Sequence, residues 1–387
     1  MPEPDRRRRN RWWDPLAGLV IAAAGLGLLE LGSYALGSFP GPSDPLITPE
    51  EPQWANARVP DPLLFWRLRE NVSGFGENPE DRGIPFSTNA LGFRGPEVGR
   101  KEPGEFRVLS LGESSTFGAQ VGAEETYSHL LQQALPRINE KNVSVINAGS
   151  HGYTIVQGFA LLHFRGLDLD PDAVLLYFGY NDFLPVHYRR GKAMGVDGPD
   201  DALNDWQLLQ QRLEPSARLS AWLLEHSNLA RGVLNLLRPS EVQPRRDPAT
   251  SEVTETRRPR VPGPARRLML ERILELCAER GIHLTVIVPW YQGFRRHEPV
   301  LRSFATENQL TLVDLPRLLP RQPVGRFRPK DPRYFGDRIH PNARGHRLMA
   351  EHIAEIVEPE WTRFDRSGST RDDSAASHSE SDEHQTR

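Results

Sequence analysis

Short apolar runs alternate with amphipathic segments between residues 104 and 358. Apolar runs of four to six residues bounded by turn residues are typical of buried strands. The segments between them repeat apolar residues three and four positions apart, which predicts helices with one buried face. The expected strands are 106–111, 143–147, 173–178, 283–288 and 311–314, and the expected helices are 126–138, 156–164, 266–280 and 341–357. This alternation predicts an α/β fold in which helices cover both faces of a parallel sheet.

The rest of the chain divides by composition. We expect a basic N-terminus (1–14), an apolar segment (15–39), a proline-rich spacer (40–62), an N-terminal apron of short strands (63–103), a main domain (104–362) and a disordered tail (363–387). Within the main domain, 183–264 is an insertion. Its first part predicts a helical cap, and its second part, poor in apolar residues, predicts a mobile loop. The arginines of that loop, Arg257, Arg258 and Arg260, are expected to be solvated.

The apolar segment at 15–39 follows a basic flank, Arg6–Arg9, and contains Glu30 as its only charge. A basic flank before an apolar stretch predicts a transmembrane helix with its N-terminus inside the cell. The alternative is a signal peptide cleaved near Ala35-Leu36-Gly37. Both interpretations place the main domain outside the cytoplasm. The expected location is a bacterial inner membrane, with the domain on its periplasmic face.

Composition narrows the range of partners. The formal net charge of the 387 residues is −3, which favours no nucleic-acid partner. The lone Cys277 excludes a disulfide within the chain. Protein partners and the oligomeric state are not predicted by these patterns.

The first apolar run of the main domain ends at Gly112, and Ser114 follows two residues later. A strand that stops at glycine and turns sharply presents the next side chains at the carboxyl end of the sheet, where ligands bind in open α/β sheets. Ser114 is therefore a candidate nucleophile, provided that a base reaches it. The alternative is that Ser114 and Thr116 only cap the next helix.

A base and an acid lie near the C-terminus, at His340 and Asp337, just before the last predicted helix. Histidine has a pKa suited to taking a proton from a serine hydroxyl near neutral pH. A carboxylate must fix the tautomer of the imidazole and stabilise its charged form. Three residues apart on one tight loop, Asp337 and His340 can share a hydrogen bond while the ring points at Ser114.

Two further strand ends carry Gly152 and Asn181. An oxyanion needs preorganised hydrogen-bond donors. The backbone N–H groups of Ser114 and Gly152 and the side-chain amide of Asn181 can supply three, with Gly149 as the reserve for Gly152.

Neighbouring polar residues have other interpretations. We expect His346 to be structural and Asp182 to brace the loop of Asn181. His151 flanks Gly152 and is a candidate for a substrate pocket.

Several rival chemistries lack their motifs. The chain has no Gly-x-Ser-x-Gly elbow of the α/β-hydrolases, no Gly-x-Gly-x-x-Gly turn opening a helix and no P-loop. It also has no metal-ligand spacing. We therefore expect no cofactor and no metal.

Four blocks, 112–114, Gly152, 179–182 and 337–340, resemble in this order the four signature blocks of the SGNH/GDSL hydrolase family. The stretch 89–95 resembles membrane-tethered bacterial members. The resemblance covers residues 104–358. It implies a flavodoxin-like, doubly wound sheet of about five parallel strands, here with a helical cap insertion and an N-terminal transmembrane helix.

The same resemblance implies roles for individual residues. It makes Ser114 the nucleophile, His340 the base and Asp337 the orienting acid, with an oxyanion hole formed by Ser114, Gly152 and Asn181. One departure concerns the residue before the serine, which is usually Asp in the family and is Glu113 here. Since that residue is outside the triad, the change concerns the packing of the turn.

The expected function is that of a serine esterase acting through an acyl-enzyme, with O-acetylated carbohydrate of the cell envelope as a candidate substrate. An O-acyltransferase that passes the acyl group to a glycan hydroxyl is a second hypothesis. A catalytically silent glycan-binding module is a third, although such a module has no need for both a triad and an oxyanion hole.

Overall fold

The computed structural model describes residues 13–35, 57–75, 83–184, 188–189, 192–193, 203–214, 227, 229, 258–291, 295–320, 331–337 and 339–382. The chain forms two compact units. One combines Met1–Pro45 with Gln211–Val253, and the other combines Leu46–Gln210 with Thr254–Arg387. The second unit contains the sheet and every predicted site residue.

The second unit is built on a six-stranded sheet in the order β12-β11-β8-β5-β7-β6. Its strands are β5 (Glu105–Gly112), β6 (Arg137–Ile138), β7 (Lys141–Gly149), β8 (Ala173–Tyr177), β11 (His283–Val288) and β12 (Thr311–Asp314). All pairs are parallel except β6 with β7. The α/β prediction and its five strands are confirmed. The short antiparallel strand β6 was not predicted.

Strand β6 replaces the end of the predicted helix 126–138. The helix there, α4 (Tyr127–Ala134), ends before Pro136. A residue before proline is pushed out of the helical conformation, so the chain leaves the helix and pairs with β7 instead. The apolar spacing that suggested a longer helix is explained by Ile138, which is buried in the core from β6.

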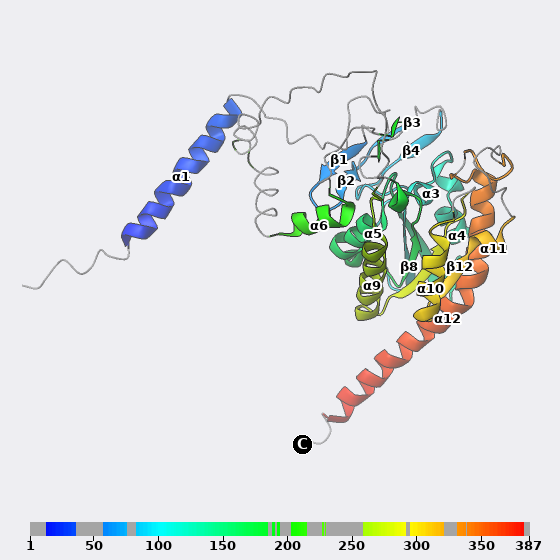
Figure 1. The fold of residues 1–387 in the computed structure, drawn as a ribbon. Coiled ribbons are helices and arrows are strands. Elements are labelled where there is room, and N and C mark those ends of the chain that lie inside the picture. Colours follow the sequence, from blue (N-terminus) through cyan, green and yellow to red (C-terminus); the bar gives the residue numbers. More distant parts are fainter. Residues whose placement is uncertain are drawn as a thin grey trace, which may run out of the picture. The chain divides into compact units, whose positions relative to one another are not determined.

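Helices cover both faces of the sheet, so its central strands β5, β8 and β11 are buried along almost their whole length. Helices α4 and α12 (Ala343–Asp382) pack together on one face. The other face carries α5 (Ile155–Leu161), α9 (Gly263–Glu279) and α10 (Glu298–Glu307) (Figure 1). Shorter elements are α3 (Ser114–Phe117), α11 (Leu315–Leu318), the 3-10 turns η2 (Ala123–Glu125), η4 (Leu167–Leu169) and η5 (Asn181–Phe183), and the π-helical turn η3 (Leu162–Gly166).

Helix α12 continues to Asp382, beyond the expected end at 357 and into the segment 363–387 predicted to be disordered. Side-chain contacts explain its first extra turns. Trp361 is fully buried against Phe106. Asp365 accepts a hydrogen bond from Asn139 and forms an ion pair with Lys141. The partners Phe106, Asn139 and Lys141 lie far from α12 in the sequence, so local composition did not predict these contacts.

The N-terminal apron consists of two antiparallel hairpins, β1 (Arg58–Asp61) with β2 (Phe65–Leu68), and β3 (Ser73–Phe75) with β4 (Pro85–Ser87). The spacer predicted at 40–62 therefore ends earlier, because β1 starts at Arg58. Pro60 is tolerated in β1 because this strand lies at the edge of a two-stranded sheet.

Much of the predicted cap and loop, 183–264, lies outside the described residues. The described parts include the strand pair β9 (Tyr188–Arg189) and β10 (Lys192–Ala193) and helix α6 (Asp205–Leu213).

In the first unit, helix α1 (Trp13–Ala35) occupies the segment predicted to span a membrane, and Glu30 on it accepts hydrogen bonds from Ser227 and Leu229. Among the described residues, no helix combines the length and apolarity needed to cross a membrane. The expected transmembrane helix is thus not confirmed.

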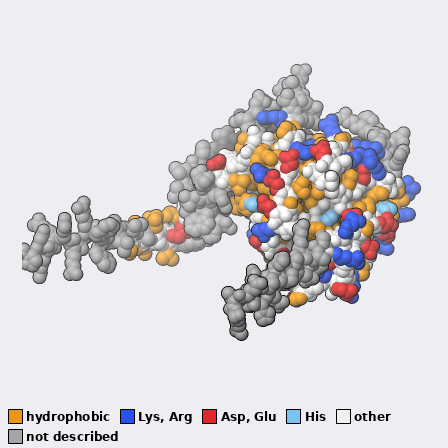
Figure 2. Space-filling model, turned by 90° about the horizontal axis from the view of Figure 1, so that it is seen from below, with side chains coloured by type: hydrophobic (Ala, Val, Ile, Leu, Met, Phe, Trp, Pro, Cys, Tyr) orange, Lys and Arg blue, Asp and Glu red, His pale blue; other side chains and the backbone are white. Residues whose placement is uncertain are grey.

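Acidic and basic side chains are interspersed with hydrophobic ones on the face seen in Figure 2. The described residues of this face form no extended surface of one charge. This mixture agrees with the small net charge of the chain.

Arg94 connects the apron to the sheet. Its guanidinium group is buried and donates hydrogen bonds to the carbonyl oxygens of Phe117 (2.8 Å), Gly118 (2.6 Å) and Val121 (2.6 Å). These carbonyls lie at the C-terminal end of α3 and just beyond it, where a helix leaves its last acceptors unpaired. The stretch 89–95 thus supports the turn that carries Ser114.

Replacing Arg94 by methionine should therefore destabilise the fold. The Arg94→Met variant keeps the apolar stem but leaves the buried carbonyls of Phe117 and Val121 without a donor, which should lower the free energy of unfolding by about 2–4 kcal/mol. Urea denaturation measures the change. The exposed Arg100→Met is the control and should shift stability by less than about 0.5 kcal/mol. Equal stability of the two variants would contradict the supporting role of Arg94.

Candidate active site

Two glycines allow the nucleophile turn to lie directly on the sheet. A Cβ atom at Gly112 would be 1.9 Å from Oγ1 of Thr116, and one at Gly149 would be 2.3 Å from the backbone nitrogen of Phe117. Since Gly112 and Gly149 are paired neighbours at the ends of β5 and β7, α3 can begin at the carboxyl edge of the sheet. Ser114 is its first residue.

The structure brings Ser114, His340 and Asp337 together in one hydrogen-bonded chain. Oγ of Ser114 lies 2.8 Å from Nε2 of His340, and Nδ1 of the same ring lies 2.5 Å from Oδ2 of Asp337. Ser114 and His340 are 7% and 5% exposed. The loop before α12 therefore places its imidazole between a serine hydroxyl and a carboxylate, as predicted from the spacing.

Asp337 is held as an acceptor on both of its oxygens. Oδ1 accepts from the backbone N–H groups of Ile339 and His340, both at 2.7 Å, and Oδ2 also accepts from Nε2 of Gln120 at 3.0 Å. Burial raises the pKa of Asp337, but the hydrogen bonds and the charge of His340 outweigh it, so the net pKa is lowered. Asp337 is therefore ionised over the neutral range.

Gln120 was not identified from the sequence. It reaches Asp337 because residue 336 is glycine, since a Cβ there would lie 1.4 Å from Oε1 of Gln120. Its backbone is in the left-handed region, with φ of 71°. No local pattern signals this contact, because the two residues are 217 positions apart.

Asn181 connects the nucleophile turn to the loop that contains Gly152. Its Nδ2 donates to Oε2 of Glu113 (2.9 Å) and to the carbonyl oxygen of Tyr153 (3.0 Å), so both amide hydrogens are used. Direct donation to an oxyanion thus requires Asn181 to share or release one of these bonds. Through these two bonds, Asn181 nevertheless lies close to the other two predicted oxyanion residues. Glu113 precedes Ser114 in the chain, and Tyr153 follows Gly152.

The reserve candidate Gly149 has its backbone N–H engaged, since it donates to Oδ1 of Asn147 at 3.1 Å. Gly152, in contrast, has a φ of 77°, a conformation that favours glycine. Of the two glycines, Gly152 is the better candidate for a donor of the oxyanion hole.

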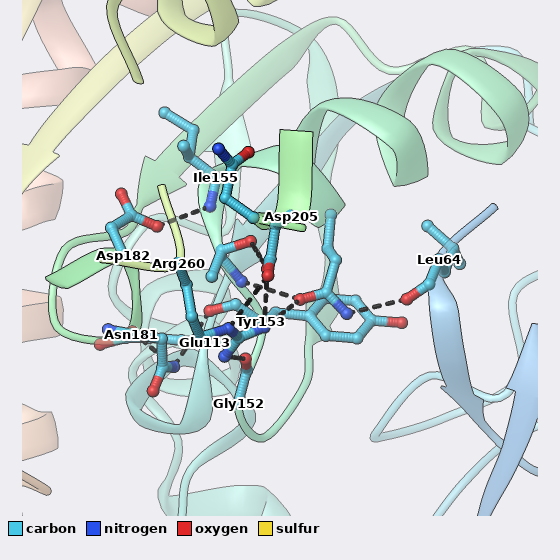
Figure 3. A network of polar contacts seen from close by, with 12 residues as sticks. Leu64, Glu113, Gly152, Tyr153, Ile155, Asn181, Asp182, Asp205 and Arg260 are labelled. Carbon is cyan, nitrogen blue, oxygen red and sulfur yellow. Dashed lines mark hydrogen bonds and ion pairs between the residues drawn. The ribbon is translucent and has the colours of Figure 1, made fainter. Parts of the chain in front are cut away.

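Figure 3 shows a buried polar network behind Gly152. Arg260 donates to the carbonyl oxygen of Gly152 (2.7 Å) and forms an ion pair with Asp205 (2.7 Å). Oδ2 of Asp205 also accepts from Thr154 Oγ1 at 2.8 Å. The expectation that Arg260 is solvated is wrong, because it is 9% exposed and paired with a carboxylate that local composition could not reveal.

Glu113 is buried next to Ser114 and accepts hydrogen bonds from two groups besides the side-chain amide of Asn181. These are the hydroxyl group of Tyr291 and the backbone N–H of Asn181. Burial raises the pKa of Glu113 to about 8, although the Tyr291 and Asn181 hydrogen bonds lower it. The nearby charge of Asp182 raises the pKa further, while that of Arg260 lowers it.

His346 is placed as predicted, in a structural position. Its Nδ1 accepts from the backbone N–H of Tyr127 at 3.1 Å. Burial lowers its pKa to about 3, aided by the charges of Arg94 and His340, so the ring is neutral near neutral pH.

Asp182 and His151 occupy different surroundings. Asp182 accepts from the backbone N–H of Ile155 (2.9 Å) and pairs with Arg266 (3.2 Å), so it braces the start of α5 and of α9 beside the Asn181 loop. His151 is buried with its ring 4.4 Å from that of Phe117. A substrate contact by His151 stays a prediction.

Comparison with known proteins points to one family. The model of the GDSL-like lipase/acylhydrolase family matches residues 110–348. No curated protein matches the chain significantly.

Similar solved structures are distant in sequence. A lipase/acylhydrolase from Enterococcus faecalis is 17% identical (TM-score 0.36, 66% of this chain and 96% of that one). A GDSL-like lipase from Bacteroides thetaiotaomicron is 15% identical (TM-score 0.38, 68% and 93%). A mutant of a Geobacillus acetyl-xylooligosaccharide esterase is 14% identical (TM-score 0.37, 67% and 98%).

The raised pKa of Glu113 predicts a pH-dependent loss of stability. Between about pH 4.5, its ordinary value, and about pH 8, the folded protein keeps a proton that the unfolded chain releases. The free energy of unfolding therefore decreases as pH rises through this window. Glu113→Gln cannot titrate, so the stability of this variant relative to the parent should increase from pH 5 to pH 8 and level off above it.

Urea denaturation at pH 5, 6, 7, 8 and 9 measures this difference, in which all other titrating groups cancel. The exposed Glu102→Gln is the matched control, because it makes the same substitution at a surface carboxyl group. A flat difference for Glu113→Gln would show that the carboxyl group titrates normally.

Proposed function

The chain belongs to the GDSL-like lipase/acylhydrolase family of carboxylic ester hydrolases, and we propose that it cleaves its ester through Ser114, His340 and Asp337. The observation that carries this assignment is the continuous hydrogen-bonded chain from Oγ of Ser114 through the imidazole to Asp337. A nucleophile, a base within hydrogen-bond reach and a group that orients the base are the parts that acyl transfer requires.

In the first half of the reaction, Oγ of Ser114 attacks the ester carbonyl carbon while Nε2 of His340 takes the hydroxyl proton. Nδ1–H of the ring donates to Asp337, which stabilises the imidazolium and keeps Nε2 free to accept. The carbonyl oxygen becomes an oxyanion and is received by the N–H groups of Ser114 and Gly152, with the Asn181 amide beside them. The imidazolium then protonates the leaving alcohol, and an acyl-enzyme remains on Ser114.

In the second half, water replaces the alcohol. His340 removes a proton from the water, whose oxygen attacks the acyl carbon and forms a second oxyanion. The ester bond to Ser114 breaks as His340 returns the proton to Oγ, and the carboxylic acid leaves. The ionised state of Asp337 supports both halves, because the ring carries a positive charge in each transition state.

For the substrate we propose an acetyl ester of a cell-envelope carbohydrate. This choice follows from the expected export of the domain, which the basic flank before the apolar segment 15–39 predicts.

The location on the outer face of a bacterial inner membrane is part of the same proposal. Fractionation of cells tests it, since the full chain should sediment with membranes and its domain should be accessible to added protease only after the outer barrier is opened.

The triad predicts a specific pattern of labelling and rate. The full chain should react with a fluorophosphonate probe, and Ser114→Ala and His340→Ala should abolish labelling. The same variants should lower kcat on 4-nitrophenyl acetate by about four to six orders of magnitude. Asp337→Asn should lower it by about 10⁴-fold, because the imidazole loses its orienting charge.

Ser115→Ala is the matched control, because this neighbouring buried serine bonds to the carbonyl oxygen of Ile339 and not to His340. It should keep labelling and most of the activity. A parent chain that neither labels nor hydrolyses esters would refute the proposed function.

The acetyl-ester assignment is tested with acyl chains of two, four and eight carbons on one alcohol, and with acetylated xylan and acetylated glucan. We expect kcat/KM to be highest for acetyl and free acetate to be the product. A preference for the eight-carbon ester would overturn the acetyl assignment. Transfer of acetate to an added sugar in place of its release would identify an acyltransferase.

A further inference from the structure

In the loop 150–154, three successive backbone carbonyl groups accept hydrogen bonds from side chains. Nη2 of Arg58 donates to the carbonyl oxygen of His151 (3.0 Å), Arg260 donates to that of Gly152 (2.7 Å), and Asn181 donates to that of Tyr153 (3.0 Å). Three successive peptide groups are thus each held by a side chain. A loop without regular secondary structure gains fixed peptide orientations in this way.

The first of these contacts determines where the Gly152 N–H points. The carbonyl of His151 and the N–H of Gly152 belong to one planar trans peptide group, in which C=O and N–H point in opposite directions. A donor that binds the His151 oxygen therefore directs the Gly152 hydrogen away from itself. The same peptide group is central to a turn that the backbone N–H of Tyr153 closes on the carbonyl oxygen of Ser150 at 3.3 Å, with Gly152 at a left-handed φ of 77°.

We propose that Arg58 is a positioning residue of the oxyanion hole, which holds the His151–Gly152 peptide so that the Gly152 N–H faces the reacting carbonyl oxygen. The inference rests on the proposed function, since it requires Gly152 to be an oxyanion donor. Arg58 belongs to strand β1 of the apron, outside the residues 110–348 matched by the family model. The apron then contributes to the chemistry of the site.

Arg58 is itself held in place by neighbours that also contact the loop. Its guanidinium carbon lies 5.3 Å from the ring centre of Trp66, and that of Arg260 lies 5.7 Å from the same ring. The backbone oxygen of Trp66 accepts from the hydroxyl group of Tyr153 at 2.8 Å. The hairpin β1–β2 and the loop thus form one packed unit with the guanidinium group between them.

The approach of Arg58 to the glycine is close. A Cβ atom at residue 152 would lie 3.8 Å from Nη2 of Arg58 and 3.4 Å from Cζ2 of Trp66. A positive charge on the carbonyl side of the peptide also polarises the group and strengthens its N–H as a donor. Arg58 therefore acts on both the direction and the strength of the Gly152 hydrogen bond.

A charge at the oxyanion hole affects the transition state more than the bound ester, because the negative charge develops only as Ser114 attacks. Arg58→Met in the full chain should therefore lower kcat on 4-nitrophenyl acetate by about 10- to 100-fold, while KM changes by less than about twofold. Arg58→Lys keeps the charge and one donor and should recover part of the loss.

A second measurement separates positioning from a general loss of structure. A trifluoromethyl ketone forms a charged tetrahedral adduct with the serine, so its inhibition constant should weaken by the same factor as kcat/KM across the parent, Arg58→Lys and Arg58→Met. Arg67→Met on the same hairpin is the matched control, because Arg67 pairs with Asp61 and Glu70. It should leave both quantities within twofold of the parent.

The outcomes separate the two proposals. A parent that hydrolyses the ester and an Arg58→Met variant with unchanged kcat would overturn the role of Arg58 and leave the proposed function intact. Loss of ester hydrolysis and labelling in the parent itself would overturn both. If thermal melting shows that Arg58→Met does not fold, Arg58→Gln decides, because it loses the charge and shortens the reach of the donor. A kcat equal to that of the parent together with an unchanged inhibition constant would then overturn the inference.

Discussion

The hydrogen bond between Ser114 and His340 joins residues that are 226 positions apart. It exists only because β5 and the loop before α12 reach the same edge of the sheet. A backbone group reinforces this meeting, since the N–H of Tyr127 donates to Nδ1 of His346 on α12. Parallel strands covered by helices on both faces make such an edge rigid. The packing of α12 against α4 is therefore part of the site as much as of the core.

The pattern of apolar runs predicted the five parallel strands, because a buried strand has a strong local signal. The meeting of Ser114, His340 and Asp337 was equally accessible, since Asp337 and His340 are neighbours on one loop and Ser114 follows a strand end. What the sequence could not predict depends on contacts between distant segments. The continuation of α12 past Trp361 and the burial of Arg260 are of this kind, and local composition assigned them to disorder and to solvent. The end of α4 has a local cause instead, since Pro136 forces the preceding residue out of the helical conformation.

The replacement of the usual Asp by Glu113 illustrates the same limit within the site. From the sequence, it concerned only the packing of a turn. In the structure, the longer side chain is buried between the hydroxyl group of Tyr291 and the amide of Asn181. A carboxyl group in such surroundings resists ionisation, because burial penalises its charge more than the hydrogen bonds favour it. Its position therefore couples the residue before the nucleophile to the residue predicted to complete the oxyanion hole.

The part of the insertion between Asp205 and Arg260 is compatible with this site because its two ends are tied together. The backbone N–H of Asp205 donates to the carbonyl oxygen of Arg260 at 2.9 Å, and their side chains form a buried ion pair. A buried carboxylate without its partner is strongly destabilising, so the chain must return to Arg260 however long the segment between them is. Loop length costs little once the ends are fixed. The insertion can thus vary in size while the network behind Gly152 stays unchanged.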